Sequence, residues 1–464
     1  MNLDFLSIVD EKADLLRETA DFLWEHPETA FTEFESAACL CNALRQEGFT
    51  VTENLANIPT AFSGTFGSGK PVIGILGEFD ALTGLGQTAQ VTHKEPDGKP
   101  CGHGCGHNLL GAASLGAAIA VKHYLEKTGT SGTVIYFGCP GEEGGSGKAF
   151  MARDGVFDAL DAAVTWHPAD ETGVRIKTSL ANCQVLYKFD GVASHAGSKP
   201  HLGRSALDAV ELMNVGVNFL REHVVQEARM HYAITDAGGF SPNVVQPHAE
   251  VLYLIRAPKN EQVADIYARI NDIAKGAALM TGTKESHEFI KACSNTVLND
   301  TLQQVMYEKM LEIGEPQVSE EDIAFAREIT EKSLMAAPHA DPEHPIHYEI
   351  LPYHKGDIQI GSGSTDVGDV SWVCPTVQAR AATCARGTPG HTWQKTAQGK
   401  GHLTQVMVQY VAKVMAATAA ELMENPAVLA EAKEELRRRT GKDGYICPIP
   451  KDVVPRAMSS FTKK

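Results

Sequence analysis

The sequence has little of several features that mark whole classes of proteins. Its most apolar run, 109–121, is too short and too rich in glycine and alanine to cross a membrane, so we expect a buried helix there. Positive charge is scarce, because 41 Lys and Arg stand against 58 Asp and Glu, which gives a formal net charge of −17. A surface of that sign repels phosphates, so we expect no binding to nucleic acid or to a membrane.

Cysteine is too sparse for a disulfide framework. The ten cysteines are scattered over 464 residues, and one of them lies two residues from a histidine. The first twelve residues form an acidic amphipathic segment without the basic and apolar regions of an export signal. We therefore expect a cytoplasmic protein with reduced thiols.

Two common catalytic motifs are absent. There is no Gly-x-Ser-x-Gly segment, so serine-hydrolase chemistry has no anchor. The segment 144–148 resembles a phosphate-binding loop, but Gly141 lies one residue too far from Gly147 and Lys148, and Ala149 stands where a hydroxyl residue is required. Internal repeats and low-complexity tracts are also missing, so we expect ordinary globular domains. A chain of this length predicts two or three of them.

Polar side chains directly follow three short apolar segments that have the character of strands. Asp80 follows 72–76, Glu142 and Glu143 follow 133–137, and His167 follows 162–166. Apolar strands that alternate with helices predict an α/β fold, with a mostly parallel sheet covered by helices on both faces. Ligands bind beyond the carboxyl ends of such strands, so we expect these four side chains to lie close together.

The pattern changes near residue 183. Between 184 and 292 the segments follow the order β-α-β-β-α-β of a ferredoxin-like domain, and their alternation of apolar and polar residues suits a sheet with one open face. We predict a catalytic domain formed by 1–182 and 294–464, and a lid or dimerisation domain at 183–293.

Metal-ligand chemistry is concentrated in two glycine-rich segments. Cys105 and His107 can reach one point from a turn, and the adjacent carboxylates of Glu142 and Glu143 repel each other unless a cation lies between them. Each pair also has an ordinary interpretation, as a buried thiol with a surface histidine and as a solvated acidic turn. Cys105 could be a nucleophile, but its neighbours suit a metal ligand better.

Other histidines are weaker candidates on their own. His103 is a possible extra ligand, whereas His339, His344, His347 and His354 lie in a Pro-rich segment that we interpret as an exposed connection. In the inserted domain, His195, Asn243 and Arg256 carry the donors that recognise an oxyanion and a carboxylate, although a structural role is at least as common for each.

The motifs together resemble the dinuclear metallohydrolase family of aminoacylases, indole-acetyl-amino-acid hydrolases and glutamate carboxypeptidases. The likeness runs through nearly the whole chain. It is carried by the segments 77–82, 102–111 (GHGCGHNLLG), 138–145 (GCPGEEGG), 166–168, 200–208, 242–246, 364–372 and 387–394 (GTPGHTWQ).

The resemblance implies a role for each candidate. The implied metal ligands are Cys105, His107, Glu143, His167 and His391. Glu142 is implied as general acid and base, and Asp80 as the residue that orients a ligand, with Asp366 a weaker candidate for that task. His195 is implied as an oxyanion donor, usually from the partner subunit, and Asn243 and Arg256 as the groups that hold the substrate carboxylate.

Two departures from the family pattern leave open the identity and the occupancy of the second metal ion. Glu78 stands where many members have a histidine ligand, and Asn108 stands where many have an aspartate. The expected cofactors are divalent ions, two per subunit. A thiolate favours Zn²⁺, and several carboxylates allow Mn²⁺.

The resemblance therefore implies a zinc-peptidase-like amidohydrolase with a small anionic N-acyl amino acid as substrate. The expected reaction converts p-aminobenzoyl-glutamate to p-aminobenzoate and glutamate. The alternatives are a broad deacylase or dipeptidase, for example of the indole-acetyl-aspartate type, and a non-catalytic partner of a paralogous subunit. The expected assembly is a homodimer through the lid domain, and assembly with a paralogous A-type subunit is the alternative.

Overall fold

Within residues 3–457, which a computed structural model describes, the chain forms an eight-stranded sheet, a four-stranded sheet and a two-stranded ribbon. The order of the large sheet is β1-β2-β6-β3-β7-β14-β8-β13. Its central strands β6, β3, β7 and β14 are parallel. The predicted mostly parallel sheet is confirmed, with antiparallel pairs β1–β2, β2–β6 and β8–β14 added outside the centre.

The strands of the large sheet and the ribbon are Thr50–Glu53 (β1), Phe62–Ser68 (β2), Val72–Glu78 (β3), Leu82–Thr83 (β4), Cys101–Gly102 (β5), Gly132–Cys139 (β6), Ala162–Ala169 (β7), Glu171–Val174 (β8), His347–Ile350 (β13) and Thr376–Ala382 (β14).

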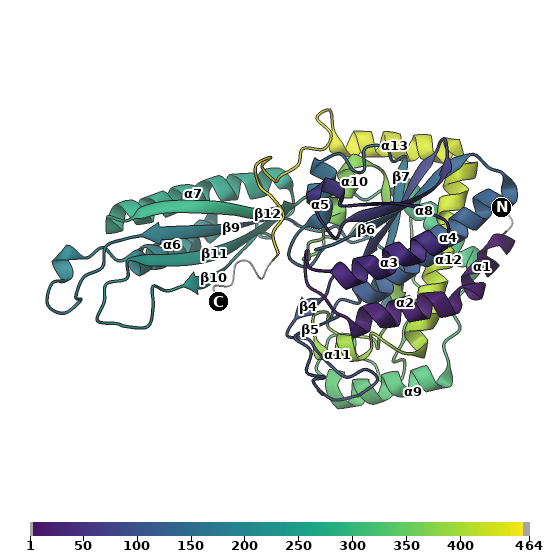
Figure 1. Ribbon diagram of the computed structural model, residues 1–464, viewed down its shortest axis with the longest axis horizontal. Helices are drawn as coiled ribbons and strands as arrows, with labels where there is room; N and C mark the ends of the chain where they lie inside the picture. The colour runs from purple at the N-terminus through teal and green to yellow at the C-terminus, as the bar shows by residue number, and fades with distance from the viewer. Residues whose placement is uncertain (1–2, 458–464) are drawn as a thin grey trace.

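Each face of the large sheet has its own core, because successive side chains point to opposite sides. Ile75 and Val164 belong to one core with α4 and α12, whereas Leu76 and Ala163 belong to the other with α5 and α10. Helices therefore cover both faces, as predicted (Figure 1). The helices of this part are Ser7–Glu11 (α1), Ala13–Glu25 (α2), Phe34–Gln46 (α3), His107–Thr128 (α4), Gly147–Arg153 (α5), Asp300–Ile313 (α8), Glu320–Ile329 (α9), Val367–Val373 (α10), Trp393–Ala397 (α11), His402–Glu424 (α12) and Pro426–Thr440 (α13).

Two long apolar helices form the centre of the larger core. The apolar run 109–121 lies in α4 and is buried, as expected. Helix α12 is long and apolar enough to cross a membrane by composition, but 78% of its most apolar window is buried inside the fold, where it packs on α4. A helix that is apolar on most of its surface needs burial on all sides, which this position provides.

The four-stranded sheet belongs to a separate small domain, which we define as the segment from β9 to β12. Its strand order, β10-β11-β9-β12, and its antiparallel pairing confirm the predicted ferredoxin-like insertion. Val251 and Tyr253 of β11 are buried on the side that α6 and α7 cover. The elements are Ala181–Asp190 (β9), Ala206–Leu220 (α6), Arg229–Asp236 (β10), His248–Ala257 (β11), Asn260–Thr281 (α7) and Lys284–Cys293 (β12).

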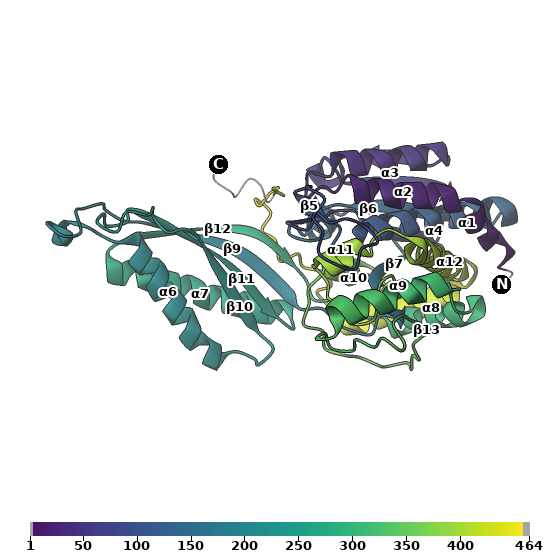
Figure 2. The same ribbon diagram turned by 90° about the horizontal axis from the view of Figure 1, so that it is seen from below.

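The small domain extends away from the rest of the molecule (Figure 2). Its sheet occupies 181–293, and the domain limits given above remain a prediction. The terminal residues 1–2 and 458–464, which that prediction assigns to the catalytic domain, lie outside the described residues.

Candidate metal centre

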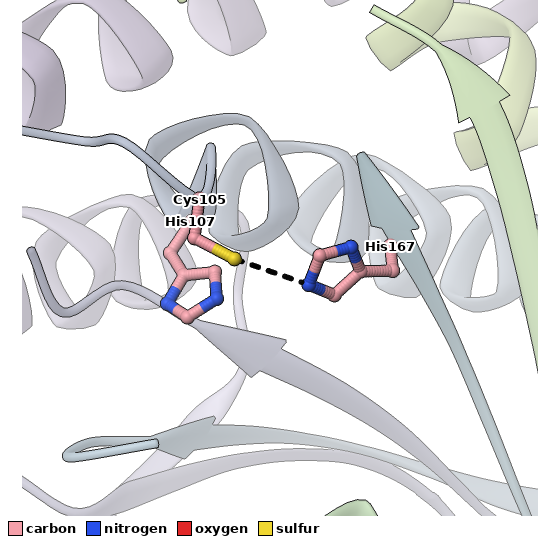
Figure 3. Close-up of side chains that lie close together, drawn as sticks. All are labelled: Cys105, His107 and His167. Carbon is pink, nitrogen blue, oxygen red and sulfur yellow. Dashed lines mark hydrogen bonds between the residues drawn. The ribbon is translucent and has the colours of Figure 1, made fainter. Parts of the chain in front are cut away.

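The carboxyl ends of β3, β6 and β7 and the start of α4 meet at one place. Here Cys105, His107 and His167 each offer a ligand atom, and these atoms all lie within 4.8 Å of one another. The Cys105 Sγ lies 3.4 Å from His167 Nε2, with the His107 ring beside them (Figure 3). Gly106 between the two loop ligands has φ +87°, and a Cβ there would meet Pro168 at 3.0 Å. The turn therefore requires glycine.

Two further groups adjoin the first. Cys105, Glu143 and His391 form one, and Glu78, His107 and Glu142 form the other, again with ligand atoms within 4.8 Å of one another. The structure thus brings all five proposed ligands to one centre, together with Glu142. The loop that carries His391 is tied to the cysteine loop, because the His391 N–H donates to the Gly104 carbonyl at 2.9 Å.

Asp80 is buried and holds two of these residues in place. Its Oδ1 lies 2.9 Å from His107 Nδ1, and its Oδ2 accepts the Glu143 N–H at 2.9 Å. The Nδ1 of His167 lies 2.9 Å from the Pro168 carbonyl oxygen. Because one ring nitrogen of each histidine is occupied, Nε2 of both rings faces the centre, as in metal-binding histidines.

The charges around the centre favour anionic ligands. Burial and Glu143 raise the pKa of the Cys105 thiol, but His107 and His167 outweigh them and bring it to about 6. Burial raises the pKa of Glu143, but contact with His391 and the charge of His107 lower it to about 2. A thiolate and a carboxylate are therefore available at neutral pH.

Glu142 has the opposite tendency. Burial, followed by the carboxylates of Glu78, Glu143 and Asp366, raises its pKa well above the ordinary value. A glutamate with a raised pKa can both accept and return a proton near neutral pH, which is what a general acid and base requires.

The donor set fits a divalent metal. Among the described residues, Glu78 Oε2 and His107 Nε2 are buried without a hydrogen-bond partner. Buried polar atoms are rarely left in this state unless a ligand satisfies them. Sulfur, imidazole nitrogen and carboxylate oxygen are the ligands that Zn²⁺ takes in proteins.

Two buried residues around the centre, Lys148 and Glu33, have no role predicted from the sequence, and Asp366 has a different role from the predicted one. Lys148, dismissed above as part of a false phosphate loop, is fully buried between Glu78 and Asp366. Asp366 therefore contacts Lys148 rather than a proposed ligand. Glu33 accepts the Gly141 N–H at 2.9 Å and so holds the loop before Glu142. Nothing local in the sequence marks Glu33, because its partners lie far along the chain.

Among the described residues, none of the weaker histidine candidates belongs to the ligand groups. His103 is buried, and its Nε2 lies 2.9 Å from the Leu23 carbonyl oxygen. His339, His344 and His354 are exposed, and His347 is half-buried in β13.

The proposed substrate groups lie in the small domain and are divided between its two ends. His195 follows the outer end of β9, and its Nδ1 accepts the N–H groups of Gly197 and Ser198, which leaves the proton on Nε2. The Asn243 carbonyl accepts the Ala196 N–H, so Asn243 lies near His195. Arg256 is paired with Asn182 at the inner end, and its buried Nε has no partner among the described residues. The structure therefore separates Asn243 from Arg256 within one chain.

Known proteins match most of the chain. The sequence profile of peptidase family M20/M25/M40 matches residues 74–447. The chain is 49% identical to the B subunit of p-aminobenzoyl-glutamate hydrolase of Escherichia coli, over 96% of this chain and 97% of that protein. It is 27% identical to Xaa-Arg dipeptidase of Mus musculus, over 92% of this chain and 90% of that protein. A dinuclear metal-binding M20 peptidase of Bacillus subtilis has the same fold, with a TM-score of 0.57 and 16% identity over 89% of this chain and 99% of that chain.

Proposed function

This chain belongs to peptidase family M20/M25/M40, and from that premise we propose that it hydrolyses p-aminobenzoyl-glutamate to p-aminobenzoate and glutamate. The chain is a divalent-metal hydrolase of amide bonds. The observation that carries the proposal is the convergence of Cys105, Glu143 and His391 with Glu142 at one centre. The 49% identity to the E. coli protein supports the choice of substrate.

We assign the metal to the five side chains that converge there, Cys105, His107, Glu143, His167 and His391. Cys105 belongs to two of the ligand groups, which supports the proposal that the five side chains would hold two ions. Zn²⁺ suits the thiolate and Mn²⁺ suits the carboxylates. Bound divalent ions would act as Lewis acids that lower the pKa of a water in the site and polarise the amide carbonyl.

The protein's own residues perform the proton transfers. Glu142 accepts a proton from the attacking water and returns it to the amide nitrogen, which leaves as the amine of glutamate. The Nε2–H of His195 donates to the carbonyl oxygen as that oxygen gains negative charge. The oxygen of the water becomes part of the p-aminobenzoate carboxylate.

The small domain would recognise the anionic end of the substrate. Because the chain has a net charge of −17, an acidic substrate needs a local cation, and the half-buried Arg256, whose Nε has no hydrogen-bond partner among the described residues, supplies one. Asn243 would bind the same carboxylate from a second chain, since it lies at the other end of the small domain.

A homodimer through the small domain is the proposed assembly. Leu212, Val215 and Phe219 expose apolar surface along α6, and Tyr232 and Ile234 do so on the edge strand β10. A patch of this kind on an edge element favours a protein partner. The E. coli relative is one of the subunits of a hydrolase, so a paralogous A-type subunit is the second candidate for that surface.

All ten cysteines are described and free, which supports the proposed cytoplasmic location.

The test compares substrates and variants of the purified chain. We expect faster hydrolysis of p-aminobenzoyl-glutamate than of indole-acetyl-aspartate or simple dipeptides. The similarity to Xaa-Arg dipeptidase makes dipeptidase activity the second candidate, and a preference for dipeptides would establish it. Glu142→Gln should lower kcat by about 10²- to 10⁴-fold while elemental analysis still finds two ions per chain. A wild-type chain without any activity would instead indicate a non-catalytic partner.

A further inference from the structure

Lys148 is a lysine without access to solvent at the edge of the metal centre. Its Nζ lies 2.8 Å from Glu78 Oε1 and 2.6 Å from Asp366 Oδ1. Asp366 also accepts the backbone N–H of Lys148 at 2.8 Å, so one carboxylate binds both ends of this residue. A buried ammonium is stable only when it is paired. These contacts supply the pairing and also fix the position of Lys148.

Because the Lys148 ammonium contacts one carboxylate oxygen of Glu78, the two oxygens have different neighbours. Oε1 is occupied by Lys148, and Oε2 lies 3.3 Å from His107 Nε2. Both of these facing atoms are buried without a hydrogen-bond partner among the described residues. The other ring nitrogen of His107, Nδ1, contacts Asp80. Glu78 Oε2 and His107 Nε2 are therefore the two atoms that remain available to bind an ion.

The separation of this pair suits two ligands of one ion. Ligand atoms about 2.0–2.1 Å from a zinc ion at the tetrahedral angle lie about 3.3 Å apart. Glu142, the third member of the group, has a carboxylate oxygen within 4.8 Å of both. Glu78 therefore has the position, the burial and the free lone pair of a ligand.

We propose that Glu78 is a further metal ligand of this chain, on the same ion as His107, and that Lys148 is the positioning residue that selects the Glu78 oxygen facing the ion. The proposal rests on the metal-dependent function proposed above and adds a ligand to it. A glutamate would thus replace the histidine expected from the family at this place. Lys148 supplies the positive charge that lets Glu78 and Asp366 be buried side by side.

The experiment measures Zn²⁺ binding rather than hydrolysis. The full-length chain is stripped of metal and titrated with Zn²⁺ against a coloured chelator. The variants are Glu78→Gln, Lys148→Met and the double variant, which removes one charge of each sign, leaves the net charge of the site unchanged and serves if Lys148→Met alone does not fold. We expect one of two ions to bind about 10- to 100-fold more weakly in each single variant, the range found when the residues that support metal ligands are removed. The double variant should be no weaker than Glu78→Gln, because Lys148 acts through Glu78.

Lys309→Met is the matched control. Lys309 is also buried and lies 2.9 Å from Glu421 and 3.1 Å from Glu312, but it is on α8, away from the ligand groups. Its loss should lower the melting temperature and leave both Zn²⁺ affinities unchanged. With Co²⁺ in place of Zn²⁺, the visible d–d bands should change in Glu78→Gln, and the sulfur-to-metal band from Cys105 should persist.

The outcomes separate the two proposals. Two ions bound to Glu78→Gln with wild-type affinity and an unchanged cobalt spectrum would overturn the ligand assignment and leave the hydrolase proposal standing. A wild-type chain that binds no divalent ion would overturn both.

Discussion

At the scale of single residues, metal binding by this chain is coupled to protons. Contact with Cys105 and then Glu143 raises the pKa of His391 to about 10 in the ion-free protein. The ring is therefore protonated at neutral pH and must lose its proton before Nε2 can bind a metal. Cys105, with a pKa of about 6, is already deprotonated at neutral pH.

We expect the apparent Zn²⁺ affinity to rise with pH between about 6 and 10, by about tenfold per pH unit for each proton released. The ion-free state holds the proton and the loaded state does not, so lower pH favours the ion-free state. Calorimetry in buffers of different ionisation enthalpy measures the number of protons released. His391→Gln should release fewer protons than the wild type, and an affinity that does not change with pH contradicts this coupling.

Arg256 gives a second prediction at this scale. Its Nε is buried without a partner among the described residues, so Arg256→Gln removes no hydrogen bond from that nitrogen. We expect KM for p-aminobenzoyl-glutamate to rise by about 10- to 100-fold, because a charged hydrogen bond to a carboxylate contributes about 1.5–3 kcal/mol. The melting temperature should change little. A substrate in which the α-carboxylate is amidated is the control, since its KM should differ little between wild type and variant.

At the scale of elements, one buried carboxyl connects three parts of the chain. Asp369 of α10 accepts the N–H and the hydroxyl of Ser294 at 3.0 and 2.8 Å, and the hydroxyl of Tyr445 at 2.9 Å. Ser294 directly follows β12, and Tyr445 lies in the segment after α13. The carboxyl therefore joins the exit of the small domain to the catalytic domain and to the C-terminal segment.

Burial raises the pKa of Asp369 from 3.8 to about 7. A raised pKa means that the folded chain keeps a proton that the unfolded chain loses between those pH values. The contribution of this group to stability is thus fully present below pH 4 and is lost as pH rises through 7. We expect the free energy of unfolding to fall more steeply from pH 5 to pH 8 in the wild type than in Asp369→Asn, as measured by urea unfolding of the ion-free chain.

Tyr445→Phe is the control for that experiment. It removes one hydrogen bond, which contributes about 1 kcal/mol, and keeps the carboxyl. Its stability should be lower than that of the wild type at each pH, with the steep decline retained. Equal declines in the wild type and Asp369→Asn would show that Asp369 does not titrate in this range.

Local patterns explain which elements and site residues could be predicted. Asp80 and Glu142 follow strongly apolar strands, and His167 lies near the end of another, β7. The geometry of a parallel sheet brings the ends of such strands together. Strand β1 was missed because its residues, 50–53, are mostly exposed and polar and show no apolar run. It exists because it pairs with β2.

The roles of Lys148 and Glu33 could be assigned only from the fold, and so could the contact of Asp366 with Lys148, because the sequence suggested Asp366 only as a weaker candidate for orienting a ligand. Lys148 has no local partner, since Glu78 and Asp366 approach it from distant parts of the chain. The glycine-rich segment around it resembles a phosphate loop and does not indicate a buried ion pair. The resemblance assigns Asn243 and Arg256 to one carboxylate site. In the fold, the length of β11 separates these two residues, which the resemblance alone does not reveal.

At the scale of the whole molecule, the length of the small domain bears on which chain completes the active site. Strand β9 leaves the catalytic domain at Ala181 and has ten residues, a span of about 30 Å, before the loop that carries His195 begins. The metal ligands lie in the catalytic domain, beyond the first residue of β9 and on the side away from His195. We therefore expect His195 and Asn243 to serve the active site of a second chain, and Arg256, which is paired with Asn182 near the start of β9, to serve its own.

A heterodimer of two inactive chains tests this arrangement. His195→Ala lacks the oxyanion donor and Glu142→Gln lacks the base, so each homodimer should lose about 10²-fold or more in kcat. The two variants, co-expressed with different tags and purified through both, form a dimer with two unlike sites. If His195 acts on the partner's site, the His195→Ala chain keeps its own Glu142 and receives an intact His195, so one site of two is complete. That dimer should have about half of the wild-type kcat per dimer, since one oxyanion donor and one base are restored together.

If His195 acts within its own chain, neither site is complete and the mixed dimer stays as inactive as its parents. Metal content equal to that of the wild type in all three dimers excludes loss of the ions as the cause.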